Sequence, residues 1–135
     1  MNKTRIPFQN SATIDGDGLP KASEVVTLFN SVTAFGAKNL QNVGENYWLS
    51  VTIRCDQNAT GNSLTADFSE DGGTTWINFY TSATNTPTGG TTFVDEIFIG
   101  QYLDVRLRFT NGSVKQTVFK CPLTLDAKAR DTAGI

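Results

Sequence analysis

The chain has 135 residues, of which 39% are hydrophobic and 10% aromatic, so it is long enough for one globular domain with a buried core. Charged residues make up 18% and the net charge is -2, with no basic run of the kind that holds a phosphate backbone. This composition excludes a disordered chain and argues against nucleic-acid and membrane partners, since no segment reaches the roughly 20 apolar residues of a membrane span.

The first segment, residues 1–23, is polar and shows no sustained hydrophobic period. We expect an extended N-terminal arm outside the core. Ile6, Phe8 and Ile14 interrupt its polar sequence, and such isolated apolar side chains could anchor the arm on a partner, where it would become ordered. The first ten residues contain no hydrophobic run typical of a secretory signal, which predicts a protein that is not exported.

From Glu24 onward, apolar and polar residues alternate with the period of two that is typical of β-strands. Clusters of Gly, Asn, Asp and Ser separate the runs, and Ser31–Gln41 has room for one helical turn. Asn111-Gly112 predicts a two-residue hairpin, because both residues tolerate positive φ. The expected strands are 24–29, 47–55, 63–68, 75–81, 91–99, 102–110 and 114–125, the last one bending at Pro122.

Strands with one apolar face each must bury those faces against one another. The sequence therefore predicts an all-β fold, a two-sheet antiparallel β-sandwich of jelly-roll or immunoglobulin-like type with an extended N-terminal arm. The sandwich domain is expected to span residues 24–126, and residues 127–135 to form a C-terminal tail.

Cys55 and Cys121 are both in phase with apolar neighbours, so both are expected to face the core. They are either buried free thiols or a disulfide between the facing sheets. Structural zinc needs about four Cys or His ligands, and the chain has no His, so neither a metal nor another cofactor is expected.

Residues 69–76, Ser-Glu-Asp-Gly-Gly-Thr-Thr-Trp, resemble the Asp-box of sialidase-type propellers, Ser-x-Asp-x-Gly-x-Thr-Trp. In those proteins the motif forms a hairpin away from the catalytic centre. The resemblance implies that Asp71 accepts hydrogen bonds from backbone amides of its own turn, that Gly73 supplies a positive φ and that Trp76 packs beneath the turn. No period of 20 to 50 residues repeats, which excludes a propeller. We therefore predict a structural turn built by Ser69, Asp71, Gly73, Thr75 and Trp76.

No catalytic site is predicted, and we expect that the protein is not an enzyme. Without His, neither a Ser-His nor a Cys-His pair can form. Asp95 and Glu96 follow one another in a probable strand and are best explained as solvated or edge-protecting charges. A pair of carboxylates for glycoside cleavage could otherwise be drawn from Asp67, Glu70, Asp71, Asp95 and Glu96.

Three side chains on outward strand faces are candidates for an interface: Trp48, Arg106 and Arg108. Both arginines share their face with Asp104, which predicts cross-strand ion pairs on a solvated sheet or, alternatively, a subunit contact, where Arg is enriched. Trp48 is expected to be covered by the arm, to pack against a neighbouring subunit or to stack on a sugar.

Together with the turn at residues 69–76, the stretch Tyr102–Gly112, Tyr-x-x-Val-Arg-Leu-x-Phe-Thr-Asn-Gly, resembles the small β-sandwich domains of tailed-bacteriophage virion proteins. The resemblance implies a structural virion protein assembled in the host cytoplasm, most simply a capsid decoration (cement) protein that forms a homotrimer. It would bind the major capsid protein or other virion proteins through its arm and one face of the sandwich. A tail or baseplate protein is an alternative, and a carbohydrate-binding or receptor-binding module that uses Trp48 or Tyr80 is another.

Overall fold

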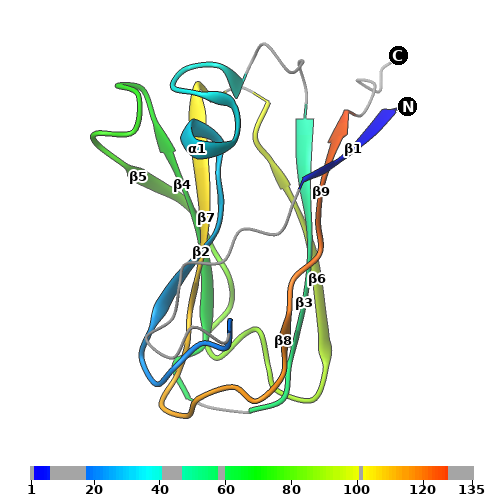
Figure 1. The fold of residues 1–135 in the computed structure, drawn as a ribbon. Helices are drawn as coiled ribbons and strands as arrows, with labels where there is room; N and C mark the ends of the chain where they lie inside the picture. The colour runs from blue at the N-terminus through cyan, green and yellow to red at the C-terminus, as the bar shows by residue number, and fades with distance from the viewer. Residues whose placement is uncertain (1, 7–17, 41–46, 58–59, 101, 128–135) are drawn as a thin grey trace.

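The computed structural model describes residues 2–6, 18–40, 47–57, 60–100 and 102–127. They form two antiparallel sheets and one short helix, so the predicted all-β sandwich is confirmed (Figure 1). The first sheet contains β1 (Asn2–Ile6), β3 (Tyr47–Cys55), β6 (Thr92–Phe98), β8 (Phe119–Lys120) and β9 (Leu123–Ala127). The second contains β2 (Val25–Asn30), β4 (Ser63–Ser69), β5 (Ile77–Thr81) and β7 (Asp104–Thr110), and helix α1 is Ser31–Phe35.

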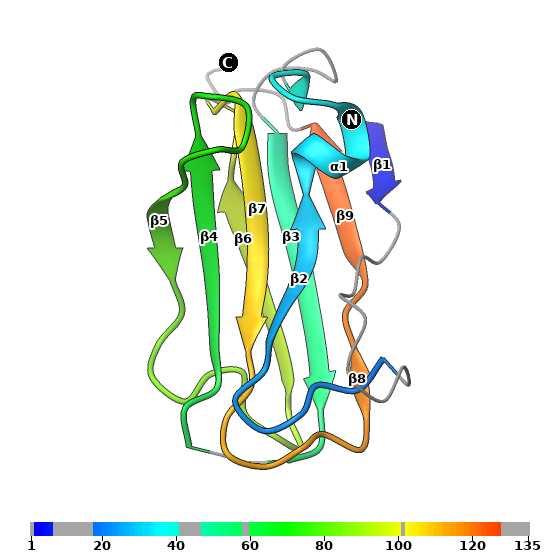
Figure 2. The ribbon, with the colours of Figure 1, turned by 60° about the vertical axis from the view of Figure 1, so that its left-hand side comes forward.

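The strand order identifies the sandwich as a jelly roll. The first sheet runs β1-β9-β3-β6 and the second β2-β7-β4-β5, and Figure 2 shows the second sheet in front of the first. The pairs β1·β9, β2·β7, β3·β6 and β4·β5 are nested, as if one long hairpin were folded over on itself. In an immunoglobulin fold the last strand would lie beside the strand before it, whereas here β9 lies between β1 and β3.

Strand β1 belongs to the first sheet, although the sequence analysis placed residues 1–23 in an arm outside the core. It pairs with β9 along its whole length, from Asn2 opposite Ala127 to Ile6 opposite Leu123. Such a ladder is made by backbone groups, so a polar sequence does not prevent it. Residues 7–17 of the predicted arm and residues 128–135 of the predicted tail lie outside the described residues.

The predicted Asn111-Gly112 hairpin is wrong. Strand β7 lies in the second sheet and β8 and β9 lie in the first, so residues 111–118 cross from one sheet to the other. Neither Asn111 nor Gly112 adopts the positive φ that a two-residue hairpin of this type requires.

The expected last strand is interrupted at Cys121-Pro122, where proline cannot donate to a ladder. Both pieces, β8 and β9, still lie beside β3, and the backbone N–H of Thr52 donates to the carbonyl of Pro122 at 3.2 Å.

The core lies between the two sheets and is built from the inward faces of both, as the alternation predicts. Cys55 and Cys121 belong to it as buried free thiols, and burial raises the pKa of Cys121 to about 12, so its thiol stays protonated. Fully buried apolar side chains come from five strands: Val26, Leu28, Phe29, Leu49, Val51, Ile53, Leu64, Ala66, Val105, Leu107, Phe109 and Leu125.

Four loops gather at the end of the sandwich that is lowest in Figure 1, and buried side chains bind them together. Gln116 is fully buried, and its side-chain oxygen accepts the backbone N–H groups of Asp56 (3.2 Å) and Gln57 (2.8 Å). Its side-chain nitrogen donates to the Gln57 carbonyl and to the side-chain oxygen of Asn111. The loop after β7 is thus bonded to the loop after β3.

Asn111 extends these contacts to the segment before β2. Its side-chain nitrogen donates to the carbonyls of Lys21 (2.7 Å), Pro20 (3.3 Å) and Val114 (2.9 Å). The side chain is 2% exposed, so these bonds replace water for three carbonyls at once.

Asn62 and Asp56 complete the set, which we call the loop network: Asp56, Asn62, Asn111 and Gln116. Asn62 accepts from the backbone of Gly112 (2.7 Å) and donates to the carbonyl of Pro87 (2.8 Å), which adds the loop between β5 and β6. Asp56 accepts from the backbone N–H of Thr117 at 2.8 Å. The loop network therefore fixes this end of both sheets.

Replacing Asn111 with Ala should lower the free energy of unfolding by roughly 2–3 kcal/mol, because three carbonyls would lose the buried side chain that donates to them. Urea denaturation monitored by tryptophan fluorescence measures it. The exposed neighbour Ser113 provides the control, and Ser113→Ala should change stability by less than about 0.5 kcal/mol. Equal effects of the two substitutions would contradict a structural role for the loop network.

Candidate functional site

The turn between β4 and β5 is organised by two side chains of its own sequence. The hydroxyl of Ser69 accepts the backbone N–H of Gly73 (2.9 Å) and donates to the Asp71 carboxylate (2.7 Å). The same carboxylate oxygen accepts the backbone N–H groups of Thr74 (3.0 Å) and Thr75 (2.8 Å). The Asp71 carboxylate is therefore engaged in holding its own turn.

Hydrogen bonds from the Thr75 backbone, and next from the Ser69 hydroxyl, hold the pKa of Asp71 well below its usual range. The carboxylate therefore stays ionised in the folded protein far into the acid range.

The turn is docked on α1. Gly73 has φ 97°, and a Cβ at that position would lie 3.1 Å from a methyl group of Val32 and 3.4 Å from the Trp76 ring. A Cβ on Gly72 would lie 3.4 Å from the Cβ of Ala37. The backbone conformation and the close approach to α1 both favour glycine at Gly73.

Asp104 ties α1 to β7 and is fully buried, whereas the sequence analysis placed it on the solvated face with the arginines. One carboxylate oxygen accepts from the Ser31 hydroxyl (3.1 Å) and the other from the backbone N–H of Lys38 (2.9 Å). The short helix covers this end of the sheet, which alternation along β7 alone does not reveal.

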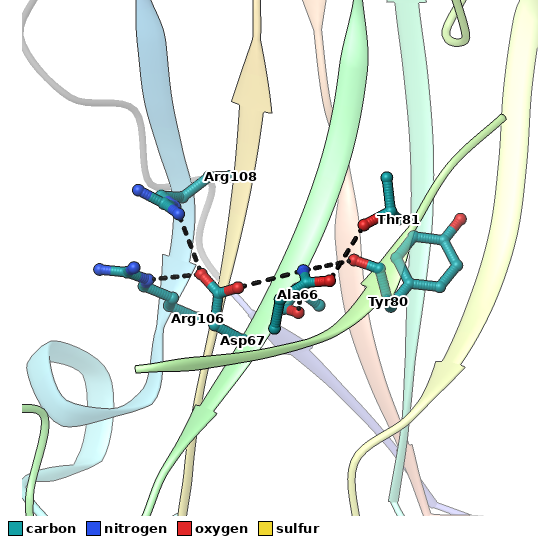
Figure 3. Close-up of polar contacts among 7 residues, drawn as sticks. Ala66, Asp67, Tyr80, Thr81, Arg106 and Arg108 are labelled. Atoms are coloured by element: carbon teal, nitrogen blue, oxygen red, sulfur yellow. Dashed lines mark hydrogen bonds and ion pairs between the residues drawn. The ribbon is translucent and has the colours of Figure 1, made fainter. Parts of the chain in front are cut away.

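Arg106 and Arg108 converge instead on Asp67 of the neighbouring strand β4 (Figure 3). The Nε of Arg106 lies 2.8 Å and a terminal nitrogen of Arg108 3.1 Å from the same oxygen, Oδ2. The other oxygen, Oδ1, accepts from the side-chain nitrogen of Asn78 on β5 at 3.2 Å. We call these residues, Asp67, Asn78, Arg106 and Arg108, the arginine network.

The members of the arginine network differ in exposure. The Asp67 side chain is 5% exposed, while those of Arg106 and Arg108 are 22% and 32% exposed. The guanidinium carbon of Arg106 also lies 4.7 Å from the centroid of the Trp76 ring, a cation–π contact that links the network to the turn. A buried carboxylate thus holds two partly exposed cations at the sheet surface.

A second arrangement lies on the outer face of the first sheet. Trp48 of β3 and Phe98 of β6 are cross-strand partners, with ring centroids 5.2 Å apart and an interplanar angle of 57°. Both are half-buried. Val94, further along β6 on the same face, is 66% exposed.

The remaining acidic candidates are dispersed. Asp95 accepts a hydrogen bond from the Tyr80 hydroxyl, and this bond joins β6 of one sheet to β5 of the other. Burial, and next this hydrogen bond, raise the pKa of the Tyr80 phenol above its usual value. Because its hydroxyl is used in this way, Tyr80 contributes to the sandwich rather than to an exposed platform.

A hollow of about 290 Å³ lies beside the turn, lined by Glu70, Asp71, Thr75 and Ile77. The described residues include no group of three or more His, Cys, Asp or Glu side chains that could hold a metal ion, and no helix among them is long and apolar enough to cross a membrane.

The structure thus brings Arg106 and Arg108 together on Asp67 and Arg106 onto the ring of the turn residue Trp76, and it places Trp48 on the opposite sheet. Phe8 and Ile14 lie outside the described residues, and for Ile6 only the backbone in β1 is described. For Asp67 the sequence suggests only a possible catalytic carboxylate. Asp67 alternates with Thr65 and Ser69 on the polar face of β4, and this pattern is visible in the sequence. Only the pairing of β4 with β7 shows that Arg106 and Arg108 lie beside it.

The chain was compared with protein-family models, with curated proteins and with solved structures, and none of them matches.

Replacing Asp71 with Ala should lower the melting temperature at neutral pH, because the turn loses its acceptor. The folded-state pKa is depressed, so this stabilisation is present above the unfolded-state value of about 4 and is lost as the pH falls toward the folded-state value. The difference in melting temperature between wild type and Asp71→Ala should therefore shrink from about pH 5 to about pH 2.

Thermal denaturation followed by circular dichroism at several pH values measures this difference. Glu70→Ala, at the exposed adjacent position, is the control and should have little effect. An Asp71→Ala variant that melts like wild type at pH 7 would show that the turn does not depend on the carboxylate.

Proposed function

We propose that the protein is a structural component of a tailed-bacteriophage virion, most simply a capsid decoration protein, with the jelly roll as a rigid body that docks through one sheet face. The resemblance of residues 69–76 and 102–112 to virion β-sandwich domains supports this proposal. The observation that carries it is the arginine network, which presents Arg106 and Arg108 on the outer face of the second sheet, with Arg106 over the ring of Trp76.

Arg and Trp are the residue types that dominate the energetics of protein–protein interfaces. Here each is held in place before any partner arrives: Asp67 fixes the two guanidinium groups, and the indole ring supports one of them. A preorganised surface of this kind loses little side-chain entropy on binding.

The loop network supports the same proposal. Surface loops usually carry the mobility of a domain, but here buried side chains bond four of them together. A stiff body suits a protein that reinforces an assembly, because little conformational freedom remains to be lost on docking.

Mass spectrometry of purified virions of the virus that encodes the chain should find the protein in a fixed ratio to the major capsid protein. Immunogold labelling should distribute over the head. Labelling confined to the tail would favour the tail or baseplate alternative, and absence of the protein from virions would contradict the proposal.

A carbohydrate-binding module is the second candidate, and the Trp48–Phe98 pair favours it. Neighbouring aromatic rings on a sheet face offer apolar area on which a sugar ring can stack. The adjacent Ser50 and Glu96, which share a hydrogen bond of 3.4 Å, add polar groups of the kind that bind sugar hydroxyls.

If this second candidate is right, a glycan array should reveal a ligand for the wild type, and Trp48→Ala should abolish that signal. Val94→Ala, a substitution on the same face, is the matched control and should retain it. A glycan signal that survives Trp48→Ala would remove the aromatic pair from consideration.

A further inference from the structure

The arginine network has a net positive charge, because it contains two arginines and one carboxylate. Two guanidinium groups share a single carboxylate oxygen, and the third partner of Asp67 is the neutral amide of Asn78. Their cross-strand neighbours on this face are uncharged: Thr27, Asn30 and Thr65, with Thr81 on β5. Asp104 lies on the same face of β7, but it is fully buried and bonded to Ser31 and Lys38. At the centre of this face the partly exposed charges are therefore the two guanidinium groups, whereas the carboxylates of Asp67 and Asp104 are buried.

The network is also short of hydrogen-bond acceptors. Each guanidinium has more N–H groups than its one bond to Asp67 uses, and the carboxylate shares its other oxygen with Asn78. The Nε of Arg108 is buried without a hydrogen-bond partner among the described residues. An acceptor from outside cannot reach that buried atom, but a carboxylate at the exposed side of the guanidinium groups would accept from their remaining N–H groups and balance their charge.

The geometry favours a carboxylate over other anionic groups of a protein partner. Arginine presents a planar fork of donors that matches the two oxygens of a carboxylate. Asp67, on the same face of the sheet, already binds both arginines through one oxygen of its carboxylate. The exposed sides of Arg106 and Arg108 offer the same kind of donor to a carboxylate that arrives from outside.

A protein segment fits this face better than an acidic sugar. A sugar ring would need an aromatic face to stack on, and one face of the Trp76 indole is already occupied by the Arg106 guanidinium. The face is a pleated sheet surface with threonine and asparagine at regular cross-strand positions, which suits a flat protein contact.

We propose that the outer face of the second sheet, centred on Arg106 and Arg108, is the docking site for an Asp- or Glu-rich segment of a partner protein. This inference rests on the proposed structural role and adds the chemistry of the partner. Asp67 acts as the positioning residue that keeps both guanidinium groups at the surface and limits their charge.

Poly-L-glutamate is a suitable first probe, with polygalacturonate as the acidic-sugar comparison, and binding is measured by fluorescence anisotropy at low salt. Wild type should bind poly-L-glutamate more tightly than polygalacturonate, and added salt should weaken binding. Arg106→Gln combined with Arg108→Gln should weaken poly-L-glutamate binding by on the order of tenfold or more.

Two further variants keep the test decisive if the double substitution unfolds the sheet. Asp67→Asn removes the internal counter-charge while keeping the shape, so it should strengthen poly-L-glutamate binding even if it lowers the melting temperature. Arg54→Gln removes an exposed arginine from β3 of the other sheet and should change affinity far less than either substitution in the network.

An equal loss in Arg54→Gln, or weaker binding in Asp67→Asn, would overturn the proposal, as would tighter binding of polygalacturonate than of poly-L-glutamate. The outcomes separate this inference from the proposed function. Absence of the protein from virions would refute the virion role while probe binding stood. Undiminished incorporation of the folded arginine variants into virions would refute the docking site while the virion role stood.

Discussion

The jelly roll depends on one constraint: its strands alternate between two sheets, so the loops that cross between the sheets must be held without a ladder of their own. In this protein, buried amide side chains do so at one end. Gln116 and Asn111 bond to carbonyl and N–H groups of loops that are distant in the sequence, and Asn62 adds the loop before β6. Because these side chains are buried, each lost bond would leave a desolvated polar atom. The bonds therefore resist separation of the loops and hold the two sheets together at this end.

The opposite end is held by different chemistry. There the short helix α1 covers the sheet, Asp104 bonds to both ends of the covering segment, and the turn after β4 packs on the helix through Gly73. Between the two ends, the middle of the second sheet is left with a polar outer face on which the arginine network lies. On this face, Asp67 and the Trp76 ring keep the long, flexible arginine side chains in a defined arrangement.

Much of the fold follows from the sequence, because burial of one face per strand imposes a period of two, and the Ser69–Trp76 turn is stabilised by bonds that span at most four residues. Asn111 and Gly112 show why the rest does not. Their local preference indicates a hairpin, but the Asn111 side chain stabilises the fold more as a buried donor to the remote carbonyls of Pro20 and Lys21. Strand β1 was missed for a related reason, since its ladder comes from backbone groups. The partner of the arginines was equally hidden, because pairing of β4 with β7 joins residues about forty positions apart.

Strand β1 also has a consequence for the integrity of the molecule. It forms the edge of the first sheet and covers the backbone N–H and C=O groups of β9 along five paired positions. Proteolysis or truncation that removed Asn2–Ile6 would bare that row of groups and turn β9 into an open edge, which is a template for edge-to-edge association between copies. To test whether residues 7–23 contribute to partner binding, it is therefore best to change residues after Ile6 and to keep β1. A truncation that also removed β1 would promote aggregation while it removed the arm, and the two effects could not be separated.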